Sequence, residues 1–185
     1  MIVASLRGLV AGEKGDLREA VKYWRQAMSL GNKSPQVQLG LASALSALGD
    51  TQSALQELRT LVSQWPDSRD AHLALAKLLA KSGDWTAAAD HARRALQMSP
   101  QNAEAALLDA QARVQLLTAG SADENPTAWD DMDKRLTSLE AAADDPIQIR
   151  LLRLQVAVQR EKFTEAQELL TQLKKDHPSH FRIAM

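Results

Sequence analysis

The chain has 185 residues, which is enough for one ordinary domain or one repeat array, and its formal net charge is −1. A charge this close to zero provides no strong field to attract nucleic acid or an anionic membrane surface. The chain has no cysteine, which excludes disulfides, thiolate chemistry and cysteine-based zinc sites.

The first half of the chain repeats a Gly-Asp dipeptide at a constant interval, with its glycines at positions 15, 49 and 83. An interval of about 34 residues is typical of repeats that consist of two helices. We expect each unit to form two antiparallel helices, with the glycine ending the first because glycine adopts a left-handed conformation at little cost. Proline would end the second helix of the later units. The helices would cross closely at small residues that recur with the same period, Gly8, Ala20, Ala42, Ala54, Ala76 and Ala88.

The second half of the chain is less regular. Residues 103–146 predict a fourth hairpin with a longer polar loop near 118–126, and Trp129 in its second helix is expected to face the core. A fifth hairpin is predicted over 147–180, with a turn at residues 160–162 that lacks glycine. Residues 181–185 begin another helix, so we expect the natural protein to continue beyond Met185.

The second and third units share residues at fixed places, namely Leu41, Ala42, Leu45, Gly49, Ala54 and Pro66, then Leu75, Ala76, Leu79, Gly83, Ala88, Ala95 and Pro100. This pattern resembles the tetratricopeptide repeat (TPR) family, although Gln38 and His72 replace the usual first aromatic residue. The resemblance implies an all-α fold, a right-handed superhelical solenoid of antiparallel helix hairpins. It would form a single array over 1–185, with repeats at about 1–34, 35–68, 69–102, 103–146 and 147–180 and a partial helix at 181–185.

The resemblance also implies a concave groove, lined by the first helix of each hairpin, in which the family binds peptides or partner helices. The corresponding residues here are Ser5, Leu9, Leu39, Ser43, Asp70, Leu73, Lys77, Lys81, Leu107, Gln111, Leu151 and Gln155. The alternative for each leucine is that it packs between neighbouring repeats. The lysine–asparagine clamp by which chaperone-binding members hold a C-terminal carboxylate is absent from these places.

Motifs of catalysis are absent from the sequence. It contains no P-loop, nucleophile elbow, dinucleotide fingerprint or zinc-ligand pattern, so we expect no catalytic, cofactor-binding or metal site. We expect Trp24 and Trp85 to pack within their hairpins and Trp65 to be exposed at a repeat edge. His72 and His91 are expected to be surface or inter-helix residues.

We therefore expect a non-enzymatic scaffold that binds a peptide or partner protein, with no nucleic-acid partner. The alternative is a structural TPR segment of a bacterial envelope, exopolysaccharide or secretion assembly. The expected location is the cytoplasm, or the periplasm if a signal peptide lies upstream. No apolar stretch approaches the roughly 20 residues that span a bilayer. Self-association through the uncapped ends of the array is a further expectation.

Overall fold

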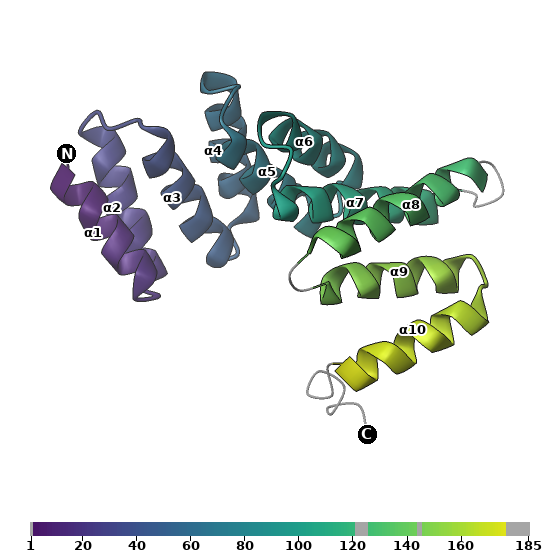
Figure 1. Ribbon diagram of the computed structural model, residues 1–185. Helices are drawn as coiled ribbons and strands as arrows, with labels where there is room; N and C mark the ends of the chain where they lie inside the picture. The colour runs from purple at the N-terminus through teal and green to yellow at the C-terminus, as the bar shows by residue number, and fades with distance from the viewer. Residues whose placement is uncertain (1, 121–125, 144–145, 177–185) are drawn as a thin grey trace. The chain divides into compact units, whose positions relative to one another are not determined.

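The computed structural model describes residues 2–120, 126–143 and 146–176 (Figure 1). Within these ranges the chain forms α-helices joined by turns and contains no strand, which confirms the predicted all-α fold of helix hairpins. The helices are α1 (Ile2–Glu13), α2 (Leu17–Ser29), α3 (Pro35–Ala47), α4 (Thr51–Gln64), α5 (Arg69–Lys81), α6 (Trp85–Met98), α7 (Ala103–Ala119), α8 (Pro126–Ala142), α9 (Ile147–Gln159) and α10 (Phe163–Asp176).

The chain divides into two compact units, Met1–Ala105 and Ala106–Met185. In the first unit, α1 packs on α2, α3 on α4 and α5 on α6, and the second helix of each of the first two hairpins also packs on the next hairpin. In the second unit, α9 packs on both α8 and α10. The single array over residues 1–185 stays a prediction. The partial helix predicted at 181–185 lies outside the described residues.

The repeated Gly-Asp dipeptide forms the same turn in each of the first three hairpins. Gly15, Gly49 and Gly83 have φ angles of 80°, 84° and 84°, which confirms the predicted left-handed helix ends. The aspartate that follows also begins the next helix. The carboxylates of Asp50 and Asp84 accept hydrogen bonds from backbone N–H groups three residues later, at 3.2 and 3.1 Å. In the second and third hairpins the dipeptide therefore both ends the first helix and caps the second, whereas Asp16 of the first hairpin makes no side-chain cap hydrogen bond.

The turn of the fifth hairpin reaches the same geometry without glycine. The Lys162 N–H donates to the Ala157 carbonyl at 2.9 Å, and the Asp50 N–H donates to the Leu45 carbonyl at 2.9 Å in the second hairpin. Glu161 takes the place of the glycine, with a φ of 56°. A left-handed residue other than glycine costs about 1–2 kcal/mol, which the packing of α9 and α10 has to offset.

The indole of Trp24 lies between the first two hairpins. A Cβ added to Gly8 of α1 would lie 2.7 Å from the Trp24 Cδ2 atom, and a Cβ added to Gly40 of α3 would lie 2.5 Å from Cε2. The ring is buried, and Ala20 on the same helix is fully buried where α2 crosses α1. The two glycines therefore form a slot that only the absence of side chains leaves wide enough for tryptophan.

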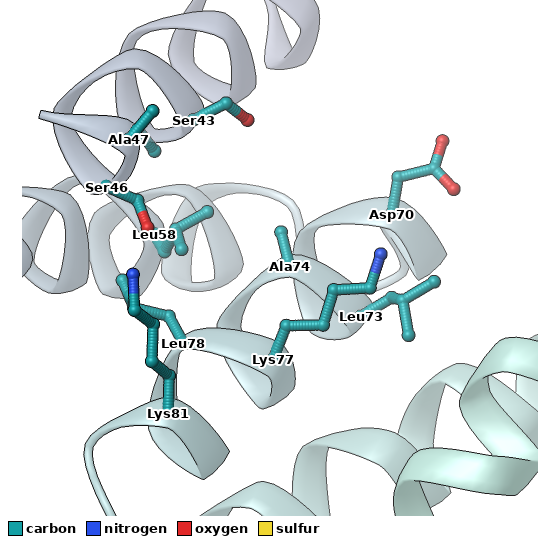
Figure 2. Close-up of a pocket in the computed structure, with 11 residues that line it drawn as sticks. Ser43, Ser46, Ala47, Leu58, Asp70, Leu73, Ala74, Lys77, Leu78 and Lys81 are labelled. Carbon is teal, nitrogen blue, oxygen red and sulfur yellow. The ribbon is translucent and has the colours of Figure 1, made fainter. Parts of the chain in front are cut away.

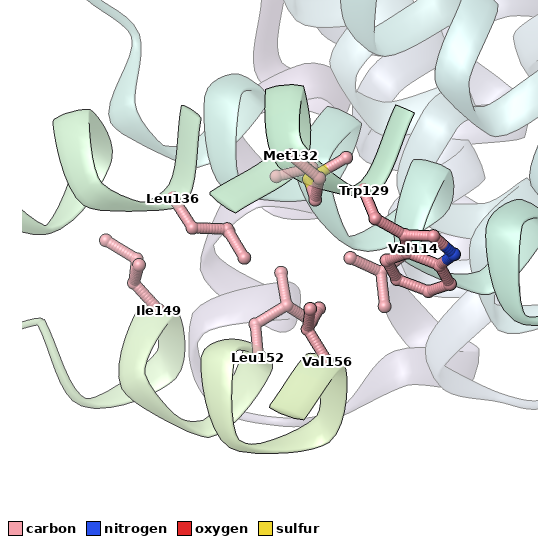
Figure 3. Packing of buried hydrophobic residues seen from close by; sticks show 8 residues of the cluster. Val114, Trp129, Met132, Leu136, Ile149, Leu152 and Val156 are labelled. Carbon is pink, nitrogen blue, oxygen red and sulfur yellow. The ribbon is translucent and has the colours of Figure 1, made fainter. Parts of the chain in front are cut away.

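The core of the second unit is built from α7, α8 and α9 (Figure 3). Trp129 is buried in this core, as predicted, and so are the other members, Ala110, Val114, Met132, Leu136, Ile149, Leu152 and Val156.

Ion pairs join α8 to the turn between α9 and α10. Asp130 and Asp133 of α8 bind the Arg160 guanidinium at 2.9 and 2.6 Å, so the charged first turns of α8 are held to the α9–α10 turn rather than left in solvent.

A buried carboxylate lies on α7. The Asp109 side chain is fully buried, and its Oδ2 accepts hydrogen bonds from Arg113 Nε at 2.9 Å and from Arg135 Nη2 of α8. Asp109 Oδ1 and Arg135 Nε have no hydrogen-bond partner among the described residues. A buried carboxylate is tolerated when charged donors satisfy it. Asp109 therefore ties the two helices of the fourth hairpin together.

Two histidines form a pair between the helices of the third hairpin, whereas the sequence left surface and inter-helix positions open and predicted no contact between them. His72 Nε2 lies 2.9 Å from the Pro66 carbonyl oxygen, and His72 Nδ1 lies 2.9 Å from His91 Nδ1. Because a carbonyl only accepts, His72 Nε2 carries the proton and its Nδ1 accepts from the His91 Nδ1–H. Burial lowers the pKa of both rings, and Arg94 lowers both further. The surroundings of the pair therefore favour the neutral form of both imidazole rings.

Acidification is expected to destabilise the third hairpin. Histidines with lowered pKa values bind protons more tightly in the unfolded chain, so stability is full above the unfolded value of about 6.5 and falls as the pH drops below it. Urea unfolding between about pH 7.5 and 5.5 checks this, with His91→Gln as the variant that should flatten the profile. Equal pH dependence in both proteins would contradict the assignment.

Candidate functional site

An open hollow with a volume of about 510 Å³ lies on the first unit, between α3 and α5 (Figure 2). Its lining comes from α3, from one residue of α4 and from α5: Ala42, Ser43, Ser46, Ala47, Leu58, Asp70, Leu73, Ala74, Lys77, Leu78 and Lys81. The buried side chains of Leu58, Leu73 and Leu78 form an apolar floor. Ser43, Asp70, Lys77 and Lys81 are exposed around it, and Ser46 is half-buried.

The two lysines of this hollow differ in their partners. Lys77 and Lys81 are four residues apart on α5 and therefore lie on one helix face. Lys77 Nζ pairs with Glu104 Oε1 at 2.5 Å, and both side chains are about half exposed. Lys81 has no ion-pair partner in the part of the chain that the structure describes. Asp70 pairs with Arg69 at 2.7 Å. The ammonium group of Lys81 is therefore available to a ligand. That of Lys77 becomes available when a ligand carboxylate replaces Glu104.

Five of the predicted groove residues line this hollow, namely Ser43, Asp70, Leu73, Lys77 and Lys81. The other three in the first unit do not. Leu39 is half-buried on α3, and Leu9 is exposed on α1. Ser5 accepts a hydrogen bond from Asn32 Nδ2 at 2.9 Å and so helps to join α1 to the turn after α2.

The remaining four predicted residues belong to the second unit. Leu107 is half-buried and packs against the core of that unit, which is the inter-helix role weighed as its alternative. Gln111 and Leu151 are exposed, and Gln155 is half-buried. Binding by any of the twelve residues stays a prediction.

The sequence-based prediction did not include Leu58 of α4, because it assigned the groove to the first helix of each hairpin only. Leu58 reaches the hollow in a place where Ala42 and Ala74 have small side chains. A signal for this existed in the repeat. Leu58 stands one repeat period after Trp24, and Ala74 stands one repeat period after Gly40. The Trp24–Gly40 contact between hairpins thus predicts a Leu58–Ala74 contact one repeat later.

A second hollow, of about 460 Å³, lies on α7 and α8 of the second unit and is lined in part by Arg113, Arg135 and Met132. Both arginines are bound to Asp109, so their charge is largely used in holding the hairpin. Over the described ranges, no group of three or more histidine, aspartate or glutamate side chains is placed to hold a metal ion. None of the helices described is long and apolar enough to cross a membrane.

A sequence model described as "Tetratricopeptide repeat" matches residues 6–56 and 39–103, which together make up more than half of the chain. No curated protein matches the chain by sequence. Many solved structures share the fold. MamA from Desulfovibrio magneticus RS-1 superposes with a TM-score of 0.81 at 17% identity, over 97% of this chain and 96% of that one.

Two further structures are similar. A tetratricopeptide repeat protein from Parabacteroides merdae ATCC 43184 has a TM-score of 0.80 at 16% identity. The match covers 95% of this chain and 66% of the Parabacteroides protein. YrrB, described as a TPR protein with an unusual peptide-binding site, has a TM-score of 0.74 at 14% identity over 96% of this chain and 86% of its own. Identities this low establish a common fold and nothing about the ligand.

Proposed function

Because the chain belongs to the tetratricopeptide repeat family, whose fold serves as a protein–protein interaction scaffold, we propose that the hollow on α3 and α5 binds an extended, acidic segment of a partner protein. One observation carries the proposal. The hollow combines an apolar floor with Lys77 and Lys81 on one face of α5.

The chemistry of the lining suits a peptide rather than a small metabolite. Ser43 and Ser46 can donate to or accept from a peptide backbone, and the two ammonium groups can each hold a carboxylate. The lining residues lie on helices that are already packed, so the ordering cost of binding falls mainly on the peptide. The scaffold is proposed to act by complementarity alone, without catalysis.

The test is a selection of peptides on the immobilised chain, followed by affinity measurements on the strongest binders. We expect these binders to be enriched in aspartate and glutamate. The double variant Lys77→Ala/Lys81→Ala should weaken their binding about 10-fold, which is about 1.4 kcal/mol and within the range for two partly exposed ion pairs.

The matched control is Lys174→Ala/Lys175→Ala, which removes two exposed lysines from the last turn of α10. It should leave the affinity unchanged. Equal losses in the two double variants would mean that the lysines act only through overall charge and would contradict a site on α5. Leu73 is a poor choice for the test, because it is buried and its removal would disturb the fold.

A place in a bacterial envelope, exopolysaccharide or secretion assembly stays a prediction, as does the cellular compartment. Fractionation of the native cell with an antibody to the chain separates the possibilities. A signal confined to the cytoplasm would contradict a role in the envelope.

A further inference from the structure

Glu104 of α7 pairs with one of the two lysines of the hollow on α3 and α5. The Lys77 Nζ and Glu104 Oε1 atoms are 2.5 Å apart, and the two side chains are 48% and 58% exposed. Both residues belong to the first unit, and Glu104 does not itself line the hollow. Lys77 therefore has a carboxylate partner before a ligand binds, whereas Lys81 has no ion-pair partner within the described ranges.

The stacking of the hairpins does not require this ion pair. Ser43 and Asp70 stand one repeat period before Lys77 and Glu104, and a serine at the first place cannot form an ion pair with Asp70. Asp70 pairs with its neighbour on α5 instead. An ion pair as exposed as that of Lys77 and Glu104 also contributes little to stability. Its position beside the hollow points to a role in binding.

Glu104 is held in place by the start of its helix. It lies in the first turn of α7, where a negative charge is favourable. Asn102 caps this turn, since its Oδ1 accepts a hydrogen bond from the Ala105 N–H at 2.8 Å. Glu104→Gln leaves the cap intact. The substitution therefore removes a charge from beside Lys77 without disturbing the helix.

The spacing of the two lysines matches two carboxylates of an extended ligand. Lys77 and Lys81 lie on one face of α5 (Figure 2), and four residues of helix rise by about 6 Å. Side chains two residues apart in an extended peptide point to the same side and are about 7 Å apart. A segment with acidic residues at i and i+2 can therefore reach both ammonium groups.

Glu104 affects ligands with one and with two acidic residues in opposite ways. When the single acidic residue of a ligand pairs with Lys81, Glu104 satisfies Lys77. Without Glu104, the ligand would cover an unpaired ammonium group, which is unfavourable. A ligand with two acidic residues gains less from the second, because that carboxylate has to displace Glu104. Glu104 thus narrows the difference in affinity between the two kinds of ligand.

We propose that Glu104 is a built-in substitute for a ligand carboxylate and determines how strictly the hollow selects for a second acidic residue. This role rests on the proposed function of the hollow and deepens it. With Glu104 in place, the site accepts segments with one acidic residue, held by Lys81, as well as segments with two at i and i+2. The partners form a broader class than two unpaired lysines would select.

The test takes a selected peptide with acidic residues at i and i+2, and its two versions with glutamine at one of these places. Titration calorimetry measures the affinities. In the wild type, the glutamine opposite Lys81 should weaken binding about fivefold and the one opposite Lys77 about twofold. In Glu104→Gln each should weaken binding about fivefold, because no internal carboxylate then replaces the missing one. Circular dichroism checks that the variant is folded.

Two controls separate this pairing from the overall charge. Glu13→Gln removes the same charge from the exposed end of α1 and should keep the wild-type ratios. In a chain that carries Lys77→Ala, Glu104→Gln should change nothing. The role of Glu104 is overturned if the smaller loss stays at about twofold in Glu104→Gln, or if the effect of Glu104→Gln persists with Lys77→Ala.

Failure of the peptide site itself gives a different result. Binding that Lys77→Ala/Lys81→Ala does not weaken, or a selection that yields no acidic peptides, overturns the proposed function of the hollow and the role of Glu104 together. Binding that the double variant weakens, with affinity ratios that Glu104→Gln leaves unchanged, overturns the role of Glu104 alone.

Discussion

Replacing Asp109 with alanine is expected to destabilise the second unit by about 1–3 kcal/mol, less than for a fully buried ion pair because the Arg113 and Arg135 side chains are 36% and 38% exposed. Asp109 has no exposed side-chain surface and is the common partner of Arg113 and Arg135. Without it the two guanidinium groups would face each other between α7 and α8 with no anion between them. Asp109→Asn keeps the shape and removes the charge, so it should fall between the wild type and Asp109→Ala.

The matched control is Asp131→Ala in the same hairpin. Asp131 pairs with Lys134 at 3.4 Å, but both side chains are almost fully in solvent, and such pairs contribute less than about 1 kcal/mol. Amide hydrogen exchange is the appropriate measurement, because it reports α7 and α8 separately from the first unit. Unchanged exchange in α7 and α8 of Asp109→Ala would show that the buried carboxylate does not hold the hairpin.

Replacing Gly40 with alanine is expected to destabilise the first unit by about 1–3 kcal/mol, although alanine is the better helix former. The new Cβ would lie within 2.6 Å of two atoms of the Trp24 ring. The ring has little room to move, because Gly8 of α1 also lies against it, where an added Cβ would be only 2.7 Å from Cδ2. The strain would therefore separate α1 from α3.

Gly12→Ala is the matched control, because Gly12 is also within a helix and an added Cβ would meet nothing within 4 Å. It should stabilise the chain by up to about 1 kcal/mol, so the two substitutions are expected to differ in sign. Urea unfolding followed by circular dichroism measures both. A second check is the triple variant Gly8→Ala/Trp24→Leu/Gly40→Ala, which should be more stable than Gly40→Ala alone. Stabilisation by Gly40→Ala itself would contradict the slot.

The course of the helices was predictable because the signals that begin and end them are local. The turn predicted at residues 160–162 lies between α9 (Ile147–Gln159) and α10 (Phe163–Asp176), and the glycine turns adopt the expected φ angles. The polar contacts inside the units were not predictable in the same way. Asp109 and Arg135 are 26 residues apart, and nothing in either local pattern distinguishes a buried charge from an exposed one.

The candidate site was predictable to the extent that it follows from the repeat. Lys77 and Lys81 were placed by the resemblance to the TPR family, and both line the hollow on α3 and α5. Leu107 shows the limit of such placement. Whether a leucine on a first helix faces a groove or packs on a neighbour depends on the size of the side chains opposite it, and here it packs on the core.

The slot for Trp24 also determines the order in which the hairpins can follow one another. Trp24 fits only because Gly40 has no side chain. One repeat later the equivalent of Gly40 is Ala74, and the equivalent of Trp24 is the smaller Leu58. A rearranged chain that joined the first hairpin directly to the third would drive the indole into the Ala74 methyl group. The repeats look interchangeable by their spacing, but the size of Trp24 restricts the first hairpin to a neighbour with glycine at the place of Gly40.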